Sequence, residues 1–541
     1  MKSRTTLLLV LAIVVLVALS EHLAFNRLFV SDELQNVFTA RLLATHEIGN
    51  YMASANLLIL GPMTWIAGAF EHSAPMLRAE RFLFFLLFWL NLILIVRCAG
   101  FRLRSKSGAL ALLLVGTLAP LWHYGFEIRH DNPLLTTVLC AWLAARPLGE
   151  NGKRRPLLVG LFAVIGQFLA FKAFVYFVPI VLIAIVAAWC YDKRPLWRVL
   201  AELAGGAAIA FIACRVIYLL SGTWTIFSGS TKDLAAAVVN DVQRLSPWPT
   251  LRVFVTECPV LVLAIVFAAV LTARHWNWRE LVSRESLAPE AGFCLAGIVA
   301  LLVNPTPFPY NLVIPTAAAA VLCLRLRPNP DWKPALIALA VIHVGMWLLA
   351  TERHYVMTNA RQIDVMTTAE QMTDPAKHRV FDGAALVPTR RPPGRFWLIT
   401  FIMLPLFENG TVPSVRSELA RGETPIIIPN YRVLELPHAD HEFMARHYVP
   451  LAGDFLVTGG RFTQSGPWDC LVPGRYYVAT KSSAAIDGIA HTIGPITLAK
   501  GAHRVEVPAG EVVWLIWLGP TLNQPPALGP GSAERILLTF A

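Results

Sequence analysis

The chain has 541 residues, of which 56% are hydrophobic and only 15% are charged, and its mean hydropathy is +0.56. This composition excludes an ordinary soluble globular protein and indicates many membrane-spanning helices. The formal net charge of +11 comes from short basic clusters between apolar runs, a pattern typical of cytoplasmic loops rather than of a nucleic-acid-binding surface. We therefore predict a multi-pass membrane protein with no nucleic-acid partner.

The first apolar run covers residues 5–20 and follows Lys2 and Arg4. A charged start before an apolar run is also typical of a cleaved signal peptide, but the many spans that follow favour a retained first helix with a cytoplasmic N-terminus. Residues 21–78 then form a long outer loop. Within it we expect two short helices, at 33–45 and 56–70, that lie at the membrane interface rather than cross it.

Hydropathy predicts about eleven spans in all, several of them shorter than the ~20 residues of a full crossing. Basic residues follow alternate spans, which places those loops in the cytoplasm and the other loops, with the tail, outside. After the first, the predicted spans cover residues 81–96, 108–122, 134–146, 157–171, 174–190, 199–220, 253–272, 290–303, 312–324 and 334–350.

After Thr351 the composition becomes mixed and polar, so we divide the chain into a membrane domain, 1–350, and an extracytoplasmic domain, 351–541. Candidate strands at 380–381, 396–402 and 426–428 indicate an α/β part. From about residue 453, alternating apolar residues and Gly-centred turns indicate a small antiparallel, β-sandwich-like part. The single tail cysteine, Cys470, excludes a disulfide within the tail, and the cysteines lack the spacing of a structural zinc site.

The outer loop begins with two adjacent acids, Asp32 and Glu33, directly after the first span. One interpretation is a helix cap, with Ser31 or Asp32 at the N-cap and Glu33 favoured by the helix dipole. The other is a reactive carboxylate, because acids beside hydrocarbon are costly unless they have water, a cation or a function. A residue at a cap is also able to act as a catalytic acid or base.

A second polar cluster, Arg129-His130-Asp131, opens a later helix on the same side of the membrane. Here too a cap with an interfacial arginine is the simpler interpretation. Lys172 interrupts an apolar hairpin, where a lysine either reaches the interface or binds an anion. Together with Arg353, Arg129 and Lys172 could hold a lipid phosphate, since an arginine fork matches phosphate oxygens. Lys232 and Arg244 fit a solvated loop face better.

The order and sidedness of these motifs resemble the GT-C superfamily of integral-membrane glycosyltransferases. The resemblance rests on the Asp32-Glu33 loop with its two interfacial helices, the Arg129–Pro133 segment, the Gly160–Pro179 hairpin with its lysine and the Asn304–Pro315 tip, and it covers residues 1–350. The chain is most similar to the bacterial branch related to protein O-mannosyltransferases and the lipid A aminoarabinose transferase. It has no Trp-Trp-Asp-Tyr-Gly motif, which argues against an oligosaccharyltransferase acting on asparagine.

The resemblance implies a bacterial inner-membrane enzyme that transfers a hexose or pentose, with inversion, from a polyprenyl-phosphate donor to a cell-envelope lipid, glycan or protein. It places Asp32 at the reaction centre as the base, with Glu33 beside it and Asp131 as the acid of the second loop. Arg129 and Lys172 would contact the carrier phosphate, and we extend this group to Arg353. We place His130 and Tyr310 in the substrate cavity.

No cofactor is certain from the sequence. Asp32, Glu33 and Asp131 have oxygen ligands that suit Mg²⁺ or Mn²⁺, and the sequence does not decide whether they bind one. Two other functions stay open: a lipid or glycan transporter, which would need charges in the middle of its spans, and a noncatalytic assembly factor that binds through the β-rich tail. The predicted spans have few charges in their middle, chiefly Arg215 and His343, and this scarcity favours the transferase over the transporter.

Overall fold

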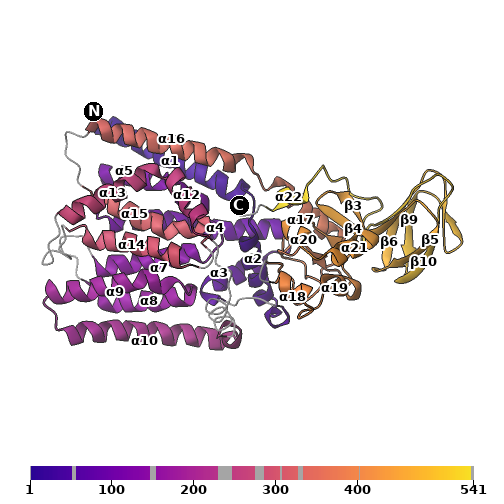
Figure 1. Cartoon of the computed structure of the whole chain (residues 1–541), viewed down its shortest axis with the longest axis horizontal. Coiled ribbons are helices and arrows are strands. Elements are labelled where there is room, and N and C mark those ends of the chain that lie inside the picture. Colours follow the sequence, from indigo (N-terminus) through magenta and orange to yellow (C-terminus); the bar gives the residue numbers. More distant parts are fainter. Residues whose placement is uncertain are drawn as a thin grey trace.

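The computed structural model describes residues 2–51, 56–146, 154–228, 246–274, 286–304, 307–326, 333–400 and 403–537. The molecule is elongated, with a bundle of helices at one end and an α/β and β-rich tail at the other (Figure 1). Two short helices of the outer loop, α2 and α3, lie where these two parts meet. The first helix, α1, packs beside the last helix of the bundle, α16.

Every predicted span coincides with one or two helices of the bundle. Their bounds are α1 Lys2–Asn26, α4 Ser73–Cys98, α5 Lys106–Gly116, α6 Ala119–Tyr124, α7 Asp131–Ala145, α8 Pro156–Leu169, α9 Ala173–Cys190, α10 Leu196–Leu220, α12 Trp248–Glu257, α13 Pro259–Arg274, α14 Ala288–Val303, α15 Val313–Arg325 and α16 Lys333–Val356. Mean hydropathy alone therefore located the bundle helices.

Two predicted spans are broken in the structure. The run 108–122 divides between α5 and α6, and Pro120 lies in the first turn of α6. The run 253–272 divides between α12 and α13, which meet at 97°. Pro259 begins α13 because its ring blocks the continuation of a preceding helix and it has no N–H to donate.

Among the described residues, four helices are each long and apolar enough to cross a membrane, namely α1, α4, α9 and α10. The bent α12–α13 pair would make a fifth. The other apolar helices are shorter than a full crossing requires. The chain is thus a multi-pass membrane protein, and the number of eleven spans stays a prediction.

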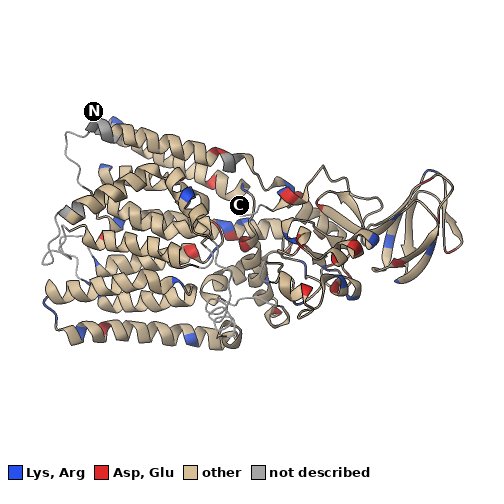
Figure 2. Ribbon diagram, in the orientation of Figure 1, with Lys and Arg blue, Asp and Glu red and all other residues tan. Residues whose placement is uncertain are grey.

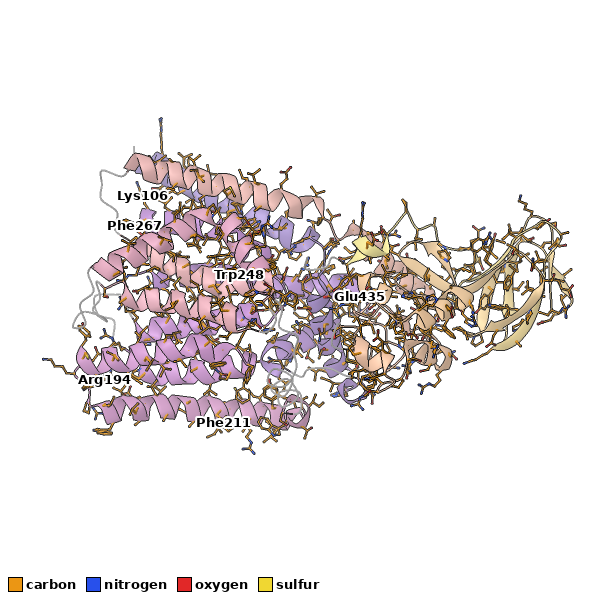
Figure 3. All side chains as sticks on the ribbon, viewed as in Figure 1. Lys106, Arg194, Phe211, Trp248, Phe267 and Glu435 are labelled. Carbon is orange, nitrogen blue, oxygen red and sulfur yellow. The ribbon has the colours of Figure 1, made fainter. Side chains whose placement is uncertain are left out.

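Charged residues are sparse along the middle of the bundle and gather at its ends and in the tail (Figure 2). Lys106 and Arg194 lie at the end of the bundle that is farther from the tail (Figure 3). That end is the one predicted to be cytoplasmic, so we call it the inner end of the bundle and call the end beside the tail the outer end. Phe211 on α10 is 44% exposed, as expected for a side chain that faces lipid.

The two predicted interfacial helices are present as α2, Ser31–Ala44, and α3, Leu57–Ala69, with a 3₁₀ turn, η1, at Ile48–Asn50 between them. Trp65 on α3 is 85% exposed, which fits an aromatic side chain at the level of lipid headgroups. The predicted cap is wrong in one respect. The N-cap of α2 is Val30, so Ser31 and Asp32 both lie within the first turn.

The tail consists of short helices around two sheets. One sheet has seven strands in the order β1-β2-β4-β11-β6-β9, with β3 also paired to β4, and the other has four, β5-β10-β7-β8. The strands are β1 Val380–Phe381, β2 Ile426–Ile427, β3 Tyr448–Ala452, β4 Phe455–Phe462, β5 Gly466–Cys470, β6 Gly474–Ala479, β7 Ala484–Ile486, β8 Ile489–His491, β9 Gly494–Leu498, β10 Gly501–Glu506 and β11 Val513–Trp517. The helices are α17 Ala360–Met372, α18 Leu404–Glu408, α19 Val415–Arg421, α20 Tyr431–Leu434, α21 His438–His447 and α22 Ala533–Ile536.

The β-sandwich-like part agrees with the prediction, since the pairs β11–β4, β11–β6 and β6–β9 are antiparallel. The two sheets share a buried core, in which the Cys470 thiol lies 3.3 Å from the Tyr476 hydroxyl. The predicted strand at 396–402 is wrong where the structure describes it. Residues 396–400 are irregular, and Trp397 and Ile399 are buried there as loop residues.

Candidate active site

Glu33 fixes the start of α2 against the bundle. Its side chain is completely buried, and its two oxygens accept hydrogen bonds from Arg81 Nε at 2.9 Å and Arg81 Nη2 at 2.5 Å. The backbone N–H groups of Val30 and Ile128 donate to the same carboxylate at 3.0 and 3.2 Å. Burial would raise the pKa of Glu33, but the charge and hydrogen bonds of Arg81 outweigh it and the pKa is lowered. Both oxygens of the Glu33 carboxylate are therefore used in contacts that hold the helices and loops together.

Asp32, one residue earlier, points toward water and toward the second outer loop. Its Oδ2 lies 2.6 Å from Arg129 Nη2, and its side chain is 30% exposed, whereas that of Arg129 is 3% exposed. Oδ1 lies 3.5 Å from the Ser31 hydroxyl, at the outer limit of a hydrogen bond. Consecutive residues of a helix differ by about 100° in direction, which is why two adjacent acids have such different surroundings.

Asp131 is the first residue of α7 and is held by Lys172. The Lys172 ammonium lies 2.5 Å from Asp131 Oδ1 and also donates to the side-chain oxygen of Asn311. Arg129 Nε is 3.8 Å and His130 Nε2 is 3.6 Å from Asp131 Oδ2. Asp131 is buried, but 19% of the Lys172 side chain is exposed. An acid at the first turn of α7 also lies favourably in the helix dipole.

Arg129 is the centre of this cluster. Its guanidinium carbon lies 3.1 Å from the centre of the Tyr310 ring, and Nη1 is 3.9 Å from Glu127. Burial alone would lower the pKa of Arg129, but the nearby carboxylates, Asp32 first and then Glu127 and Asp131, raise it above its ordinary value. The arginine therefore stays charged while it holds Asp32.

Glu127 is a buried acid that the sequence did not single out. Its Oε1 accepts a hydrogen bond from Arg27 Nη2 at 2.8 Å. Burial raises the pKa of Glu127 to about 7, although Arg27 and Arg129 act against this rise. The cluster as a whole balances four acids with four cations: Asp32, Glu33, Glu127 and Asp131 with Arg27, Arg81, Arg129 and Lys172.

The tail reaches the segment that carries Asp32. Arg432 on α20 donates from Nη2 to the Ser31 hydroxyl at 2.9 Å. The Gln362 side chain of α17 accepts from the Phe29 N–H at 2.7 Å and donates to the Phe29 carbonyl at 2.9 Å. The tail thus holds the backbone and the side chain just before the exposed acid.

The structure brings most of the predicted site residues together. Asp32, Arg129, His130, Asp131, Lys172 and Tyr310 form one connected cluster at the outer end of the bundle. Glu33 adjoins it but faces Arg81, which favours a structural role over the catalytic one that we predicted. Arg353 lies on α16, but its side chain is not among those that the structure describes. Lys232 and Arg244 lie outside the described residues.

Reasoning from the sequence missed Arg27, Arg81, Glu127 and Arg432. Arg27 and Arg81 stand at the ends of the apolar runs that become α1 and α4, and a charge at such a boundary is the one signal that marks them. Glu127 lies within the same outer loop as Arg129. No local signal marks Arg432, which is separated from Ser31 by 401 residues.

A divalent cation at these acids, which the sequence left undecided, does not fit this arrangement. Asp32, Glu33 and Asp131 each face the charged end of an arginine or a lysine, so their oxygens already have cationic partners. Within the part of the chain that the structure describes, no three His, Cys, Asp or Glu side chains form a group suited to a metal ion.

No family model and no curated protein matches the sequence. By structure, the chain is similar to ArnT from Cupriavidus metallidurans bound to undecaprenyl phosphate, with a TM-score of 0.56 and 15% identity over 84% of this chain and 97% of that one. It also matches the Archaeoglobus fulgidus oligosaccharyltransferase in complex with zinc and sulfate, with a TM-score of 0.38 and 12% identity over 85% of this chain and 71% of that one. The similarity to ArnT confirms the predicted GT-C-like fold, a helical membrane part followed by a sheet-rich tail.

Proposed function

We propose that this protein is an inverting membrane glycosyltransferase that moves a sugar from a polyprenyl-phosphate donor to a lipid, glycan or protein outside the bacterial inner membrane. The observation that carries this proposal is the partly exposed Asp32 carboxylate, held 2.6 Å from the buried Arg129 guanidinium. ArnT, which shares the fold, was solved with undecaprenyl phosphate bound, and this supports a polyprenyl-phosphate carrier here.

Asp32 is the proposed general base. As the acceptor hydroxyl attacks the anomeric carbon of the donor sugar, its proton passes to the Asp32 carboxylate. A new carbon–oxygen bond forms, the bond between the anomeric carbon and the phosphate oxygen breaks, and the electron pair leaves with the lipid phosphate. Attack from the face opposite the leaving group inverts the anomeric configuration. A positioned base of this kind contributes about 10²–10⁴ in rate.

Lys172 is the proposed ligand of the leaving phosphate. Asp131 and Asn311 accept from two of its three donors, and the third can bind a phosphate oxygen on the exposed side. Positive charge at that point stabilises the negative charge that grows on the phosphate as the sugar leaves. Arg129 is almost entirely buried, so we assign it the role of positioning Asp32 in preference to direct contact with phosphate.

The test is donor turnover by the purified full-length protein in lipid nanodiscs. A panel of undecaprenyl-phosphate hexoses and pentoses is offered with envelope lipid, glycan and protein fractions, and the release of free undecaprenyl phosphate is measured. We expect Asp32→Asn to reduce turnover on the active donor at least 100-fold. Asp364→Asn, the same change at an exposed residue of α17, should leave turnover unchanged.

The thermal unfolding midpoint of Asp32→Asn should stay close to that of the wild type, because the Asp32 side chain is partly exposed and Arg129 keeps the carboxylates of Glu127 and Asp131 nearby. If Asp32→Asn turns over the donor at the wild-type rate, Asp32 is not the catalytic base. Failure of every donor in the panel to lose its sugar would overturn the proposed function itself.

A further inference from the structure

A cavity of about 480 Å³ lies between the outer loop and the tail, apart from the Asp32–Arg129 cluster. Its volume is within the range of small-molecule sites, about 300–1,000 Å³. One wall comes from the turn after α2 and the other from the tail. The lining residues are Glu47, Asn50, Tyr51, Arg379, Arg391, Pro393, Gly394, Arg395 and Glu418.

The lining leaves positive charge without an acidic partner. Glu47 is paired with Arg391, whose Nε donates to it at 2.9 Å, and Glu418 is paired with Arg421 at 2.8 Å. Arg379 donates to the Pro392 carbonyl at 3.0 Å. Within the described part of the chain, neither Arg379 nor Arg395 forms an ion pair, although both line the cavity. Two guanidinium groups without an ion pair therefore line a cavity whose two carboxylates are each paired with another arginine.

Tyr51 supplies a polar group of a different kind. A tyrosine hydroxyl is protonated at neutral pH, and burial raises the pKa of Tyr51 further, although the neighbouring Arg379 acts against this rise. A protonated phenol both donates and accepts, as recognition of sugar hydroxyls requires. Guanidinium forks in turn match the paired oxygens of a carboxylate or a phosphate. The chemistry of the lining thus fits a saccharide that carries negative charge.

Packing connects this cavity to the helix that bears Asp32. The Tyr51 ring contacts Phe38 edge-on at 6.0 Å, and Phe38 contacts Trp397 of the tail at 4.7 Å. Asp32 is in the first turn of α2, whereas Phe38, which Tyr51 contacts, lies six residues or roughly 9 Å further along the helix. The residues that line the cavity include none of the Asp32–Arg129 cluster, so the cavity is a separate place that an extended acceptor could reach while its end lies at Asp32.

We propose that this cavity is a distal subsite for an acidic sugar of the acceptor, one that carries a uronate carboxylate or a phosphate ester. The inference rests on the proposed function and names the class of its second substrate. Arg379 and Arg395 bind the anionic group, and Tyr51 and Asn50 bind hydroxyl groups. The subsite holds the acceptor chain while its reacting end lies at Asp32.

The test is calorimetric titration of the full-length protein in detergent micelles with three probes: trigalacturonate, glucose 6-phosphate and neutral maltotriose. We expect the wild type to bind at least one acidic probe and to bind maltotriose at least tenfold more weakly. The double variant Arg379→Gln/Arg395→Gln should lose at least tenfold in affinity for the acidic probe. Arg504→Gln, a matched change at a 76%-exposed arginine of the far sheet, should bind as the wild type does.

Binding of trigalacturonate alone would identify a carboxylate as the ligand, and binding of glucose 6-phosphate alone would identify a phosphate. Equal affinity of the double variant and the wild type would overturn the subsite, as would equal binding of acidic and neutral probes. Asp32→Asn separates the two proposals, because it should bind the acidic probe normally and fail only in transfer. If the wild type binds the acidic probe but uses no donor, the proposed transferase activity is overturned and the proposed binding site stands.

Discussion

The bundle has a charge cluster at each end, and α7 connects them. At the outer end α7 begins with Asp131, which faces Lys172 and Arg129. At the inner end Arg146 follows its last residue and contacts Glu290 at 2.5 Å, and Arg325 contacts the same carboxylate. Both clusters neutralise charge at the edge of an apolar bundle. The acid at the start of α7 and the arginine after its end each interact favourably with the dipole of that helix.

The difference between the clusters is access to solvent. The inner side chains of Arg146, Glu290 and Arg325 are at most 9% exposed. In the outer cluster, Asp32 is 30% and Lys172 is 19% exposed, although they contact buried partners. A closed ion cluster has no means of contacting a substrate, whereas a partly open one presents an oriented acid and a cation to it. Access to solvent, more than charge, therefore distinguishes the candidate active site from a structural one.

The largest expected effect tests the inner cluster. Glu290→Gln removes the charge of a completely buried carboxylate that both Arg146 and Arg325 contact, so we expect a loss of about 3–5 kcal/mol in the free energy of unfolding. Turnover per folded molecule should be unchanged. The measurement is denaturant or thermal unfolding of the protein in detergent.

The matched control is Glu202→Gln, which breaks the half-exposed pair with Arg194 and should reduce stability by about 0–1 kcal/mol. If the Glu290 and Glu202 variants are equally stable, burial does not determine the contribution of these ion pairs.

The next effect separates Glu33 from its neighbour. Glu33→Gln leaves the buried Arg81 without its charged partner, so we expect a stability loss of about 3 kcal/mol. Turnover should fall only in proportion to the folded fraction, in contrast to Asp32→Asn. Unfolding and single-turnover rates on the same preparation measure both quantities. A fully stable but inactive Glu33→Gln would support the catalytic role that the sequence predicted for it.

The third effect concerns the donor. Lys172→Met removes the exposed ammonium, and we expect KM for the polyprenyl-phosphate sugar to rise about tenfold, or about 1.4 kcal/mol. Lys172→Arg should keep most of the affinity because it keeps the charge. Lys106→Met, at the opposite end of the bundle, serves as the control (Figure 3). An unchanged KM in Lys172→Met would exclude Lys172 as a phosphate ligand.

The elements and most of the outer cluster were predictable from the sequence. Apolar runs locate the bundle helices because burial in lipid requires continuous hydrophobic segments. Alternating basic loops placed Asp32, Asp131 and Lys172 on one side, and the resemblance to a family grouped them. The break at Pro259 was readable in principle, since a proline within an apolar run ends or bends a helix.

The different roles of Asp32 and Glu33 could not be predicted. Both acids have the same local sequence context, and which one is buried depends on Arg81 of α4 and the Ile128 backbone, which lie far along the chain. Contacts across hundreds of residues, such as Arg432 to Ser31, have no local pattern because they depend on how the tail docks. The irregular segment at 396–400 looked like a strand because it is apolar, but Trp397 and Ile399 are buried there without strand pairing.

The smallest expected effect tests whether the tail positions the reactive acid. Ser31→Ala removes the hydroxyl that accepts from Arg432 at 2.9 Å and lies 3.5 Å from Asp32 Oδ1. We expect kcat to fall several-fold, up to about tenfold, with KM for the donor unchanged, because Asp32 would be less well oriented. Ser417→Ala, a serine of α19 that bonds within the tail, is the control. In a double-mutant cycle with Arg432→Met, coupling of about 1 kcal/mol in kcat would show that the two side chains act together, whereas additive effects would show that Arg432 only stabilises the tail.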